Sequence, residues 1–190
     1  MKAAGVVILL LFAGVISGLW WWYLHRHVTH GAVHGFPTGI VIHHTATPPE
    51  MHGKPVDVAT IDAMHARRGF AIRNIDGRVY HIGYHFLIQQ DGTVLRGRPE
   101  ELPGAHAKGH PDMLGIALVG NFQRSSNRGR CGPLAPPRAQ LLAAEKLTRE
   151  LMRKYRLPAS GVYLNRDLRR TACPGDGFPR QQFFRAIQEP

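Results

Sequence analysis

Two segments that lie far apart in this sequence carry side chains able to bind a metal ion. His43 and His44 end the apolar run Gly39–His44, which has the composition of a buried strand. An imidazole at the end of a rigid strand is well placed to hold a metal. Cys173 lies in the Pro-Gly turn of Ala172–Asp176, where its thiolate could face a cleft. Imidazole nitrogen and thiolate sulfur are zinc donors in proteins, although each segment taken alone could equally belong to the packed core.

Five segments of the chain are informative because of their order. They are IVIHHTAT (Ile40–Thr47), IGYHFLIQQDGTVLRGR (Ile82–Arg98), GAHAKGH (Gly104–His110), GIALVGNF (Gly115–Phe122) and RDLRRTACPG (Arg166–Gly175). This set resembles the zinc-dependent N-acetylmuramoyl-L-alanine amidases, which include amidase-type phage lysozymes and the peptidoglycan recognition proteins. The resemblance extends from about Ile40 to Phe184. It implies an enzyme that cuts the amide between the lactyl group of N-acetylmuramic acid and L-alanine of the stem peptide.

The resemblance also implies roles for individual residues. His43 and Cys173 match two zinc ligands, and Tyr84 matches a tyrosine that assists the reacting carbonyl or water. Thr171 matches a position assigned to transition-state stabilisation. Three protein ligands leave one zinc position open for water, whose pKa the metal lowers towards neutrality. The substrate-binding residues that the resemblance implies are His44, His85, His106 and Asn121.

One position departs from the family pattern. Family members carry a second histidine ligand eight residues before the cysteine, and this chain has Asn165 there, within Asn165-Arg166-Asp167. No histidine follows His110. The amide oxygen of asparagine is a poorer zinc donor than imidazole, thiolate or carboxylate. Three outcomes are open: Asn165 ligates weakly, Asp167 or a neighbouring histidine replaces it, or zinc is lost.

The sequence therefore supports two functions of different classes. As an enzyme, the protein is a membrane-tethered zinc amidase acting on peptidoglycan, and the presence of His43, Tyr84, Thr171 and Cys173 favours this hypothesis. As a binding protein, it is a tethered, catalytically weak or inactive peptidoglycan-binding module, and Asn165 favours that alternative. A phage-type lysis protein released from its anchor is a third, weaker reading.

The elements that must position these residues are those of a mixed α/β fold, a central mixed sheet flanked by helices. The predicted strands include Gly39–His44, Leu114–Gly120 and Val162–Leu164, and two Asp-Gly pairs, at 76–77 and 91–92, predict hairpins. The predicted helices run from Asp57 to about Arg68, from after Pro137 to about Arg156, and over Phe178–Gln188.

The N-terminal part predicts a membrane anchor. Ala3–Leu24 is uncharged and almost wholly apolar, long enough for a hydrocarbon core of about 30 Å, and ends in aromatic residues. A cleaved signal peptide is the alternative, although its apolar core is normally shorter, about 7–15 residues. We expect residues 1–24 to be the anchor, 25–37 a histidine-rich linker and 38–190 the amidase-like domain. The linker is a polar stalk or, alternatively, a metal-gathering tract.

Composition limits the partners and the location. The net charge of +11 favours anionic partners such as wall polymers or lipid headgroups. No zinc-finger, helix-turn-helix or aromatic RNA-binding motif is present, so we expect no nucleic-acid partner. Cys131 and Cys173 are too few for a disulfide framework, although they could pair with each other. We expect a monomer in the cell envelope, held by a single span in the cytoplasmic membrane with its domain on the outer, periplasmic or wall side.

Overall fold

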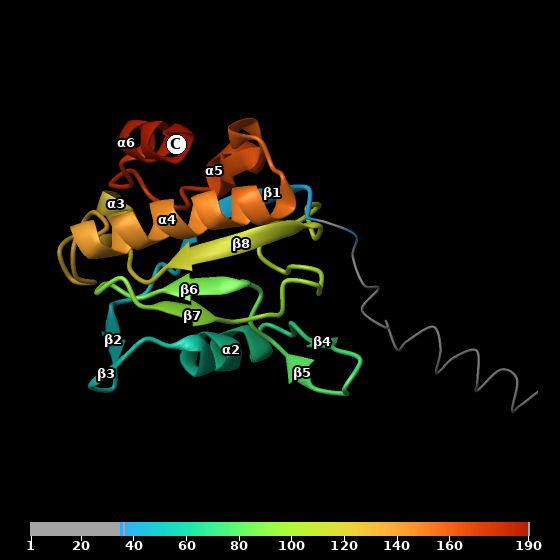
Figure 1. The fold of residues 1–190 in the computed structure, drawn as a ribbon. Coiled ribbons are helices and arrows are strands. Elements are labelled where there is room, and N and C mark those ends of the chain that lie inside the picture. The colour runs from blue at the N-terminus through green and yellow to red at the C-terminus, as the bar shows by residue number, and fades with distance from the viewer. Residues whose placement is uncertain (1–34, 36, 190) are drawn as a thin grey trace, which may run out of the picture.

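The computed structural model describes residues 35 and 37–189, and these form a mixed α/β fold (Figure 1). The predicted anchor and most of the predicted linker lie outside the described residues. Within the described part, no helix is both long and apolar enough to cross a membrane. The strands are β1 (Gly39–His44), β2 (Glu50–Met51), β3 (Lys54–Pro55), β4 (Ile72–Arg73), β5 (Val79–Tyr80), β6 (Phe86–Ile88), β7 (Val94–Arg96), β8 (Met113–Leu118) and β9 (Val162–Leu164). The helices are α2 (Val58–Ala66), α3 (Arg124–Asn127), α4 (Arg138–Tyr155), the 3-10 helix η1 (Ala159–Gly161), α5 (Asn165–Leu168) and α6 (Arg180–Gln188).

The central sheet has five strands in the order β7-β6-β8-β1-β9. β1 is parallel to both of its neighbours, β8 and β9, and β6 is parallel to β8. β7 closes one edge as the antiparallel partner of β6. The prediction of a central mixed sheet flanked by helices is therefore confirmed, and the carboxyl ends of β1, β8 and β9 meet at one end of the sheet.

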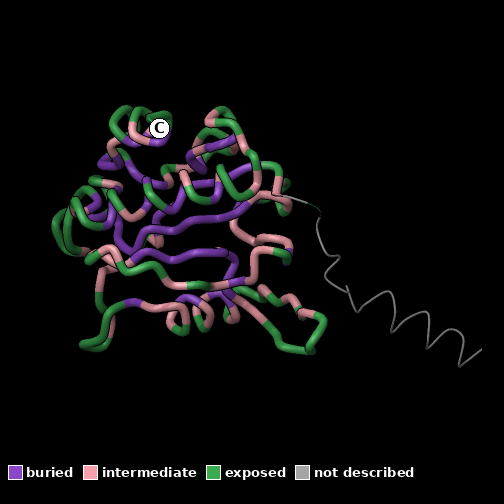
Figure 2. The backbone as a smooth tube through the Cα atoms, in the orientation of Figure 1, coloured by how far each residue is buried: buried purple, intermediate pink, exposed green. Residues whose placement is uncertain are grey.

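Helices cover both faces of this sheet. α4 and α6 lie on one side and α2 on the other, and the strands β1, β6, β8 and β9 between them are largely buried (Figures 1 and 2). The side chains of β8 alternate accordingly: Leu114, Ile116 and Leu118 belong to the core that contains the α4 residues, whereas Ala117 belongs to the core that contains Ile61 of α2. Burial on both faces explains why the central strands read as continuous apolar runs.

The register of β1 against β8 decides which way the first histidine points. His43 pairs with Ala117, and residues paired across neighbouring strands share a face of the sheet. Ala117 belongs to the core on the α2 side, so His43 projects to that side as well. His44 pairs with Leu118 and packs near Phe122, in the core on the α4 side. The two adjacent histidines therefore have different surroundings.

The local signals in the sequence correspond to the observed element ends. The Asp57 carboxylate accepts a hydrogen bond from the Thr60 backbone N–H at 2.8 Å and so caps α2, as the sequence predicted. The two Asp-Gly pairs lie in the turns of the hairpins β4–β5 and β6–β7. The long helix predicted after Pro137 is α4. The closing helix begins slightly later than predicted, at Arg180, after Pro179.

Candidate functional site

A cleft of about 990 Å³ opens where the parallel strands β1 and β9 end. The end of β1 and the residues after it line the cleft from His43 to Ala46, and the segment that follows β9 contributes Asn165, Thr171 and Cys173. Tyr84, just before β6, and the segment from Gly104 to Gly109 form further parts of the wall. Ligand sites in sheets of this kind lie at the carboxyl ends of the strands, so the position of the cleft is that of a binding site.

His43 and Cys173 meet in this cleft although 130 residues separate them. The distance from His43 Nδ1 to Cys173 Sγ is 3.6 Å. The backbone N–H of His44 points at the same sulfur, at 3.4 Å. Burial raises the pKa of the Cys173 thiol, although this N–H and the Asn165 side chain favour the thiolate. Burial lowers the pKa of His43 well below its ordinary value. The ring is therefore neutral, and a nitrogen lone pair is available to bind a metal ion.

The turn that carries Cys173 is held against the neighbouring loop. Gly175 has φ of 101°, and a Cβ there would lie 2.3 Å from the backbone carbon of Phe122. Only glycine fits a position that is both left-handed and in backbone contact. The Arg166 N–H also donates to the Cys173 carbonyl at 2.9 Å. Both cysteines are free thiols, so Cys131 does not pair with Cys173.

Asn165 occupies the position of the missing histidine and faces the same cleft. It is the first residue of α5 and is only 6% exposed. Its side chain forms a hydrogen bond with Cys173 that lowers the pKa of the thiol. Its Oδ1 is buried and has no hydrogen-bond partner. A buried acceptor without a partner costs about 1–3 kcal/mol, so this oxygen is suited to a donor or a cation in the cleft.

Two of the side chains that could replace the missing ligand, Asp167 and His106, have other partners. Asn165 and Asp167 both lie in the helix α5, where positions two apart point in different directions. The Asp167 carboxylate accepts hydrogen bonds from the Leu164 N–H and from Arg180 instead. His106 is bonded to His43 Nε2, across the ring from the nitrogen that faces Cys173.

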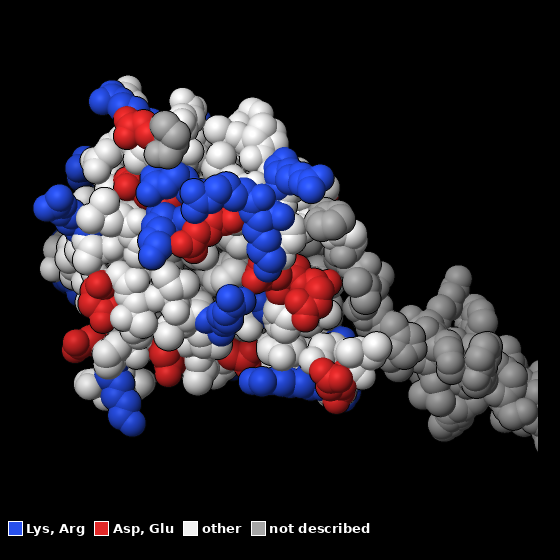
Figure 3. Space-filling model, viewed as in Figure 1, with Lys and Arg blue, Asp and Glu red and all other residues white. Residues whose placement is uncertain are grey.

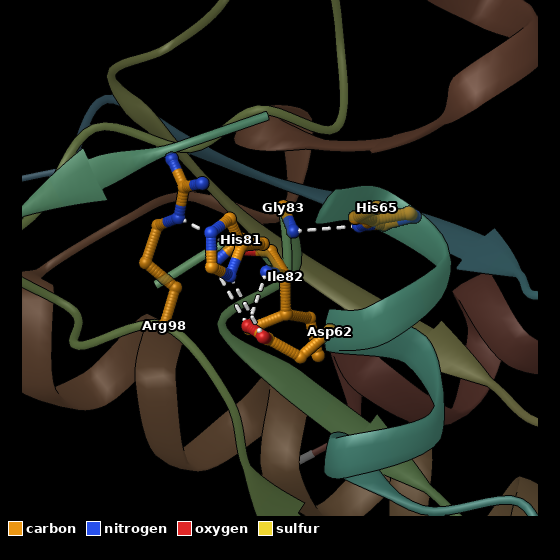
Figure 4. A network of polar contacts seen from close by, with 6 residues as sticks. All are labelled: Asp62, His65, His81, Ile82, Gly83 and Arg98. Carbon is orange, nitrogen blue, oxygen red and sulfur yellow. Dashed lines mark hydrogen bonds and ion pairs between the residues drawn. The ribbon is translucent and has the colours of Figure 1, made fainter. Parts of the chain in front are cut away.

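Two side chains of α2, one turn apart, hold the backbone that leads into Tyr84 (Figure 4). The Asp62 carboxylate accepts from the backbone N–H groups of His81 and Ile82, both at 2.8 Å, and His65 Nδ1 accepts from the Gly83 N–H at 2.9 Å. Arg98 Nε donates to the Ile82 carbonyl at 2.8 Å. Three consecutive N–H groups are thus held just before Tyr84. We call this set the α2 clamp: Asp62, His65, Arg98 and the backbone of residues 81–83.

The tyrosine itself lies among the histidines of the site. Its ring centroid is 5.2 Å from that of His43 and 5.3 Å from that of His65. Burial, followed by the nearby Cys173, raises the pKa of Tyr84, so its hydroxyl stays protonated and can donate a hydrogen bond.

The other predicted site residues fall into two groups. His44, His106, Asn121 and Thr171 line the cleft. His85 does not: its Nε2 bonds the Leu102 carbonyl and its Nδ1 accepts from the Gly115 N–H, so both ring nitrogens serve the fold.

Several cleft residues were missed by the sequence analysis. His65 is a buried residue of α2, and it also lines the cleft. Arg68, Lys108 and Arg169 line it too, and none of the described residues that line it is acidic. The only signal for these basic residues was the high net charge. A wall of this kind favours an anionic ligand.

Comparison with known proteins agrees with this arrangement. Residues 34–176 match the family model described as N-acetylmuramoyl-L-alanine amidase. The chain is 32% identical to the endolysin of Enterobacteria phage T3 over 71% of this chain and 78% of that protein. It is 34% identical to a peptidoglycan-recognition protein of Drosophila melanogaster, over 72% and 67% of the two chains. The N-acetylmuramoyl-L-alanine amidase LysC from Clostridium intestinale superposes with a TM-score of 0.66 at 31% identity, covering 86% of this chain and 93% of that one.

Proposed function

The chain belongs to the N-acetylmuramoyl-L-alanine amidase family, and from this premise we propose that it hydrolyses the amide between N-acetylmuramic acid and L-alanine in peptidoglycan. The observation that carries the proposal is the convergence of His43 and Cys173, with Nδ1 and Sγ 3.6 Å apart, beside Tyr84 in one large cleft. The similarity to a phage endolysin and to the amidase LysC supports the same activity.

Zinc is the metal that the family generally uses, and the donor set here fits it with one weak member. His43 would supply a ring nitrogen, Cys173 a sulfur and Asn165 its unpartnered Oδ1. Among the described residues, no group of three His, Cys, Asp or Glu side chains could hold a metal, so the third donor would be the Asn165 amide. When bound, zinc supplies a Lewis acid and an activated water. We propose that this chain binds it less tightly than a site with three strong protein ligands.

The protein's own side chains account for the rest of the chemistry. The protonated Tyr84 hydroxyl is a neutral donor for the negative charge that develops on the scissile carbonyl oxygen. Thr171 Oγ1 accepts from the Cys173 N–H at 3.3 Å, which leaves its own hydrogen free to donate into the cleft. Arg68, Lys108 and Arg169 would attract the carboxylates of a stem peptide.

A peptidoglycan-binding module without catalysis is the second candidate. Asn165 is the specific observation in its favour, because an amide oxygen takes the place of the imidazole that relatives use. Similarity to a peptidoglycan-recognition protein is compatible with it. In this case the cleft and its basic wall would be kept for binding, and zinc would be dispensable.

We further propose that the domain is tethered to the cytoplasmic membrane and faces the wall. The chain enters β1 at Gly39, and the cleft opens at the other end of that strand, at His44. Six strand residues span about 20 Å. A tether that arrives at Gly39 would therefore leave the cleft at the opposite end of the sheet, accessible to the wall. Basic side chains are mixed with acidic ones on the α4 side (Figure 3), and Lys154 and Arg96 both pair with Glu100.

Digestion of purified peptidoglycan tests the activity. The purified full-length protein is incubated with the polymer and zinc, and the products are analysed by mass spectrometry. Free stem peptides with L-alanine at their amino terminus are expected. The matched control is Cys173→Ala, which removes the sulfur donor and should release none. Equal release by that variant would refute the assignment of the site.

A further inference from the structure

We infer that His106 is a positioning residue that fixes His43 in the tautomer with its hydrogen on Nε2. The Nδ1 lone pair of His43 is then directed at Cys173 and available to a metal. That use of the lone pair depends on the proposed function, but the tautomer itself does not.

Only one placement of the ring hydrogens on His106 and His43 satisfies their hydrogen bonds. His106 Nε2 lies 2.8 Å from the Met113 carbonyl oxygen. A carbonyl can only accept, so Nε2 of His106 carries the hydrogen. A neutral imidazole, the main form of histidine at neutral pH, carries a single ring hydrogen. With that hydrogen on Nε2, the Nδ1 of His106 is an acceptor.

The same reasoning applies to the ring of His43. His43 Nε2 lies 3.0 Å from His106 Nδ1, which has just been assigned as an acceptor. His43 must therefore donate from Nε2. A neutral ring that carries its hydrogen on Nε2 has none on Nδ1, and Nδ1 is the atom 3.6 Å from Cys173 Sγ. The opposite tautomer of His43 would set two lone pairs against each other at 3.0 Å.

The His106 ring is confined to the slot in which it forms these bonds. A Cβ on Gly104 would lie 2.6 Å from His106 Cδ2, and a Cβ on Gly115 would lie 2.5 Å from the same atom. The ring of His85 closes another side, with its centroid 5.7 Å away and its plane nearly perpendicular. Two glycines thus make the space for the ring. A side chain that only filled the core would not need hydrogen bonds at both ring nitrogens, one of them to His43.

The direct test is nitrogen NMR of the histidine rings in the zinc-free, full-length protein at neutral pH. Labelled histidine reports which ring nitrogen carries the hydrogen, and the His43 signals are assigned with a His43→Gln variant. We expect His43 and His106 both to carry it on Nε2. A His43 signal with the hydrogen on Nδ1, or an equal mixture of the two tautomers, would overturn the inference without any variant of His106.

Variants then separate positioning from simple packing. His106→Leu fills space without an acceptor, whereas His106→Asn offers an amide oxygen near the former Nδ1. Loss of the partner of a metal-ligating histidine typically weakens metal affinity by about 10–100-fold. We expect a loss in this range for His106→Leu, measured by competition with a zinc chelator, and a smaller loss for His106→Asn. Equal affinities in His106→Leu and the unmodified protein would contradict the inference.

Two glycine-to-alanine variants, one beside the His106 ring and one not in contact with it, test whether the space around the ring matters for zinc binding. Gly115→Ala places a methyl group against the His106 ring and should weaken zinc binding as His106→Leu does. Gly161→Ala adds a methyl group whose nearest neighbour is at 3.8 Å and should change nothing. If Gly115→Ala keeps full zinc affinity in a folded protein, the slot does not position the ring. A protein that shows the expected tautomer and affinities but releases no stem peptides would keep this inference and lose the proposed amidase activity.

Discussion

Replacing Asn165 by histidine should convert a weak zinc site into a strong one. Four-ligand zinc sites bind with about 10–16 kcal/mol, so one imidazole ligand contributes about 3 kcal/mol, or about two decades of affinity. The position suits a ligand, because Asn165 lines the cleft and its Oδ1 has no hydrogen-bond partner in the fold. We expect Asn165→His to tighten zinc binding by about 100-fold in chelator competition. Stem-peptide release at limiting zinc should rise in parallel.

A series at this position makes the reasoning refutable. Asn165→Asp keeps the shape and adds a carboxylate, so its zinc affinity should lie between that of the unmodified protein and that of Asn165→His. Asn165→Leu has no donor and should bind zinc most weakly of the four. If Asn165→His binds zinc no more tightly than the unmodified, folded protein, His43 and Cys173 do not converge on a metal as their 3.6 Å separation suggests.

Three further predictions concern the tyrosine, the α2 clamp and the turn of Cys173. Tyr84→Phe should lower kcat by about 100- to 1,000-fold, as loss of an oxyanion donor does, with zinc affinity unchanged by chelator competition; an unaltered kcat would remove Tyr84 from the chemistry. Burial raises the pKa of Asp62, but its hydrogen bonds from Ile82 and His81 outweigh this and lower the pKa overall. The clamp therefore stabilises the fold above the unfolded-state pKa of about 3.9 and loses that contribution as the pH falls through the lower folded-state value. Thermal unfolding should show a smaller loss of stability on acidification in Asp62→Asn than in the unmodified protein, and identical pH profiles would contradict the assignment. Gly175→Ala should destabilise the protein by at least about 1–3 kcal/mol in denaturant unfolding, because φ of 101° and the contact with Phe122 both oppose a Cβ; an unchanged midpoint would show that the turn relaxes freely.

The fold was largely predictable because its signals are local. Continuous apolar runs marked β1 and β8, and Asp-Gly pairs marked both hairpins. Asp57 marked the start of α2 through a hydrogen bond between neighbours in sequence. Each of these features depends on residues a few positions apart, so no knowledge of the tertiary structure was needed.

The site was predictable only in part because its remaining features depend on contacts between distant segments. His43 and Cys173 were identified through the family resemblance, and the structure brings them together. The basic cleft wall needed the placement of the end of α2 against two loops, which no local pattern encodes. Asp167 was one of the alternatives left open for the third ligand, and it points away from Asn165 because the four residues after β9 form a helix instead of extending the strand.

His85 is a predicted site residue that the structure places outside the cleft. The family resemblance implied a substrate contact for His85, but two backbone groups occupy both of its ring nitrogens. In a strand-like segment, neighbouring side chains point to opposite sides, so one step along the chain separates a residue in the cleft from one that supports the fold.

The central claim is that this chain cleaves peptidoglycan between N-acetylmuramic acid and L-alanine. The most direct measurement is mass spectrometry of purified peptidoglycan after incubation with the full-length protein and zinc. The account predicts free stem peptides that begin with L-alanine, and glycan chains that keep their length. Unchanged peptidoglycan that nevertheless retains the protein in a pull-down would contradict it and would identify a binding module.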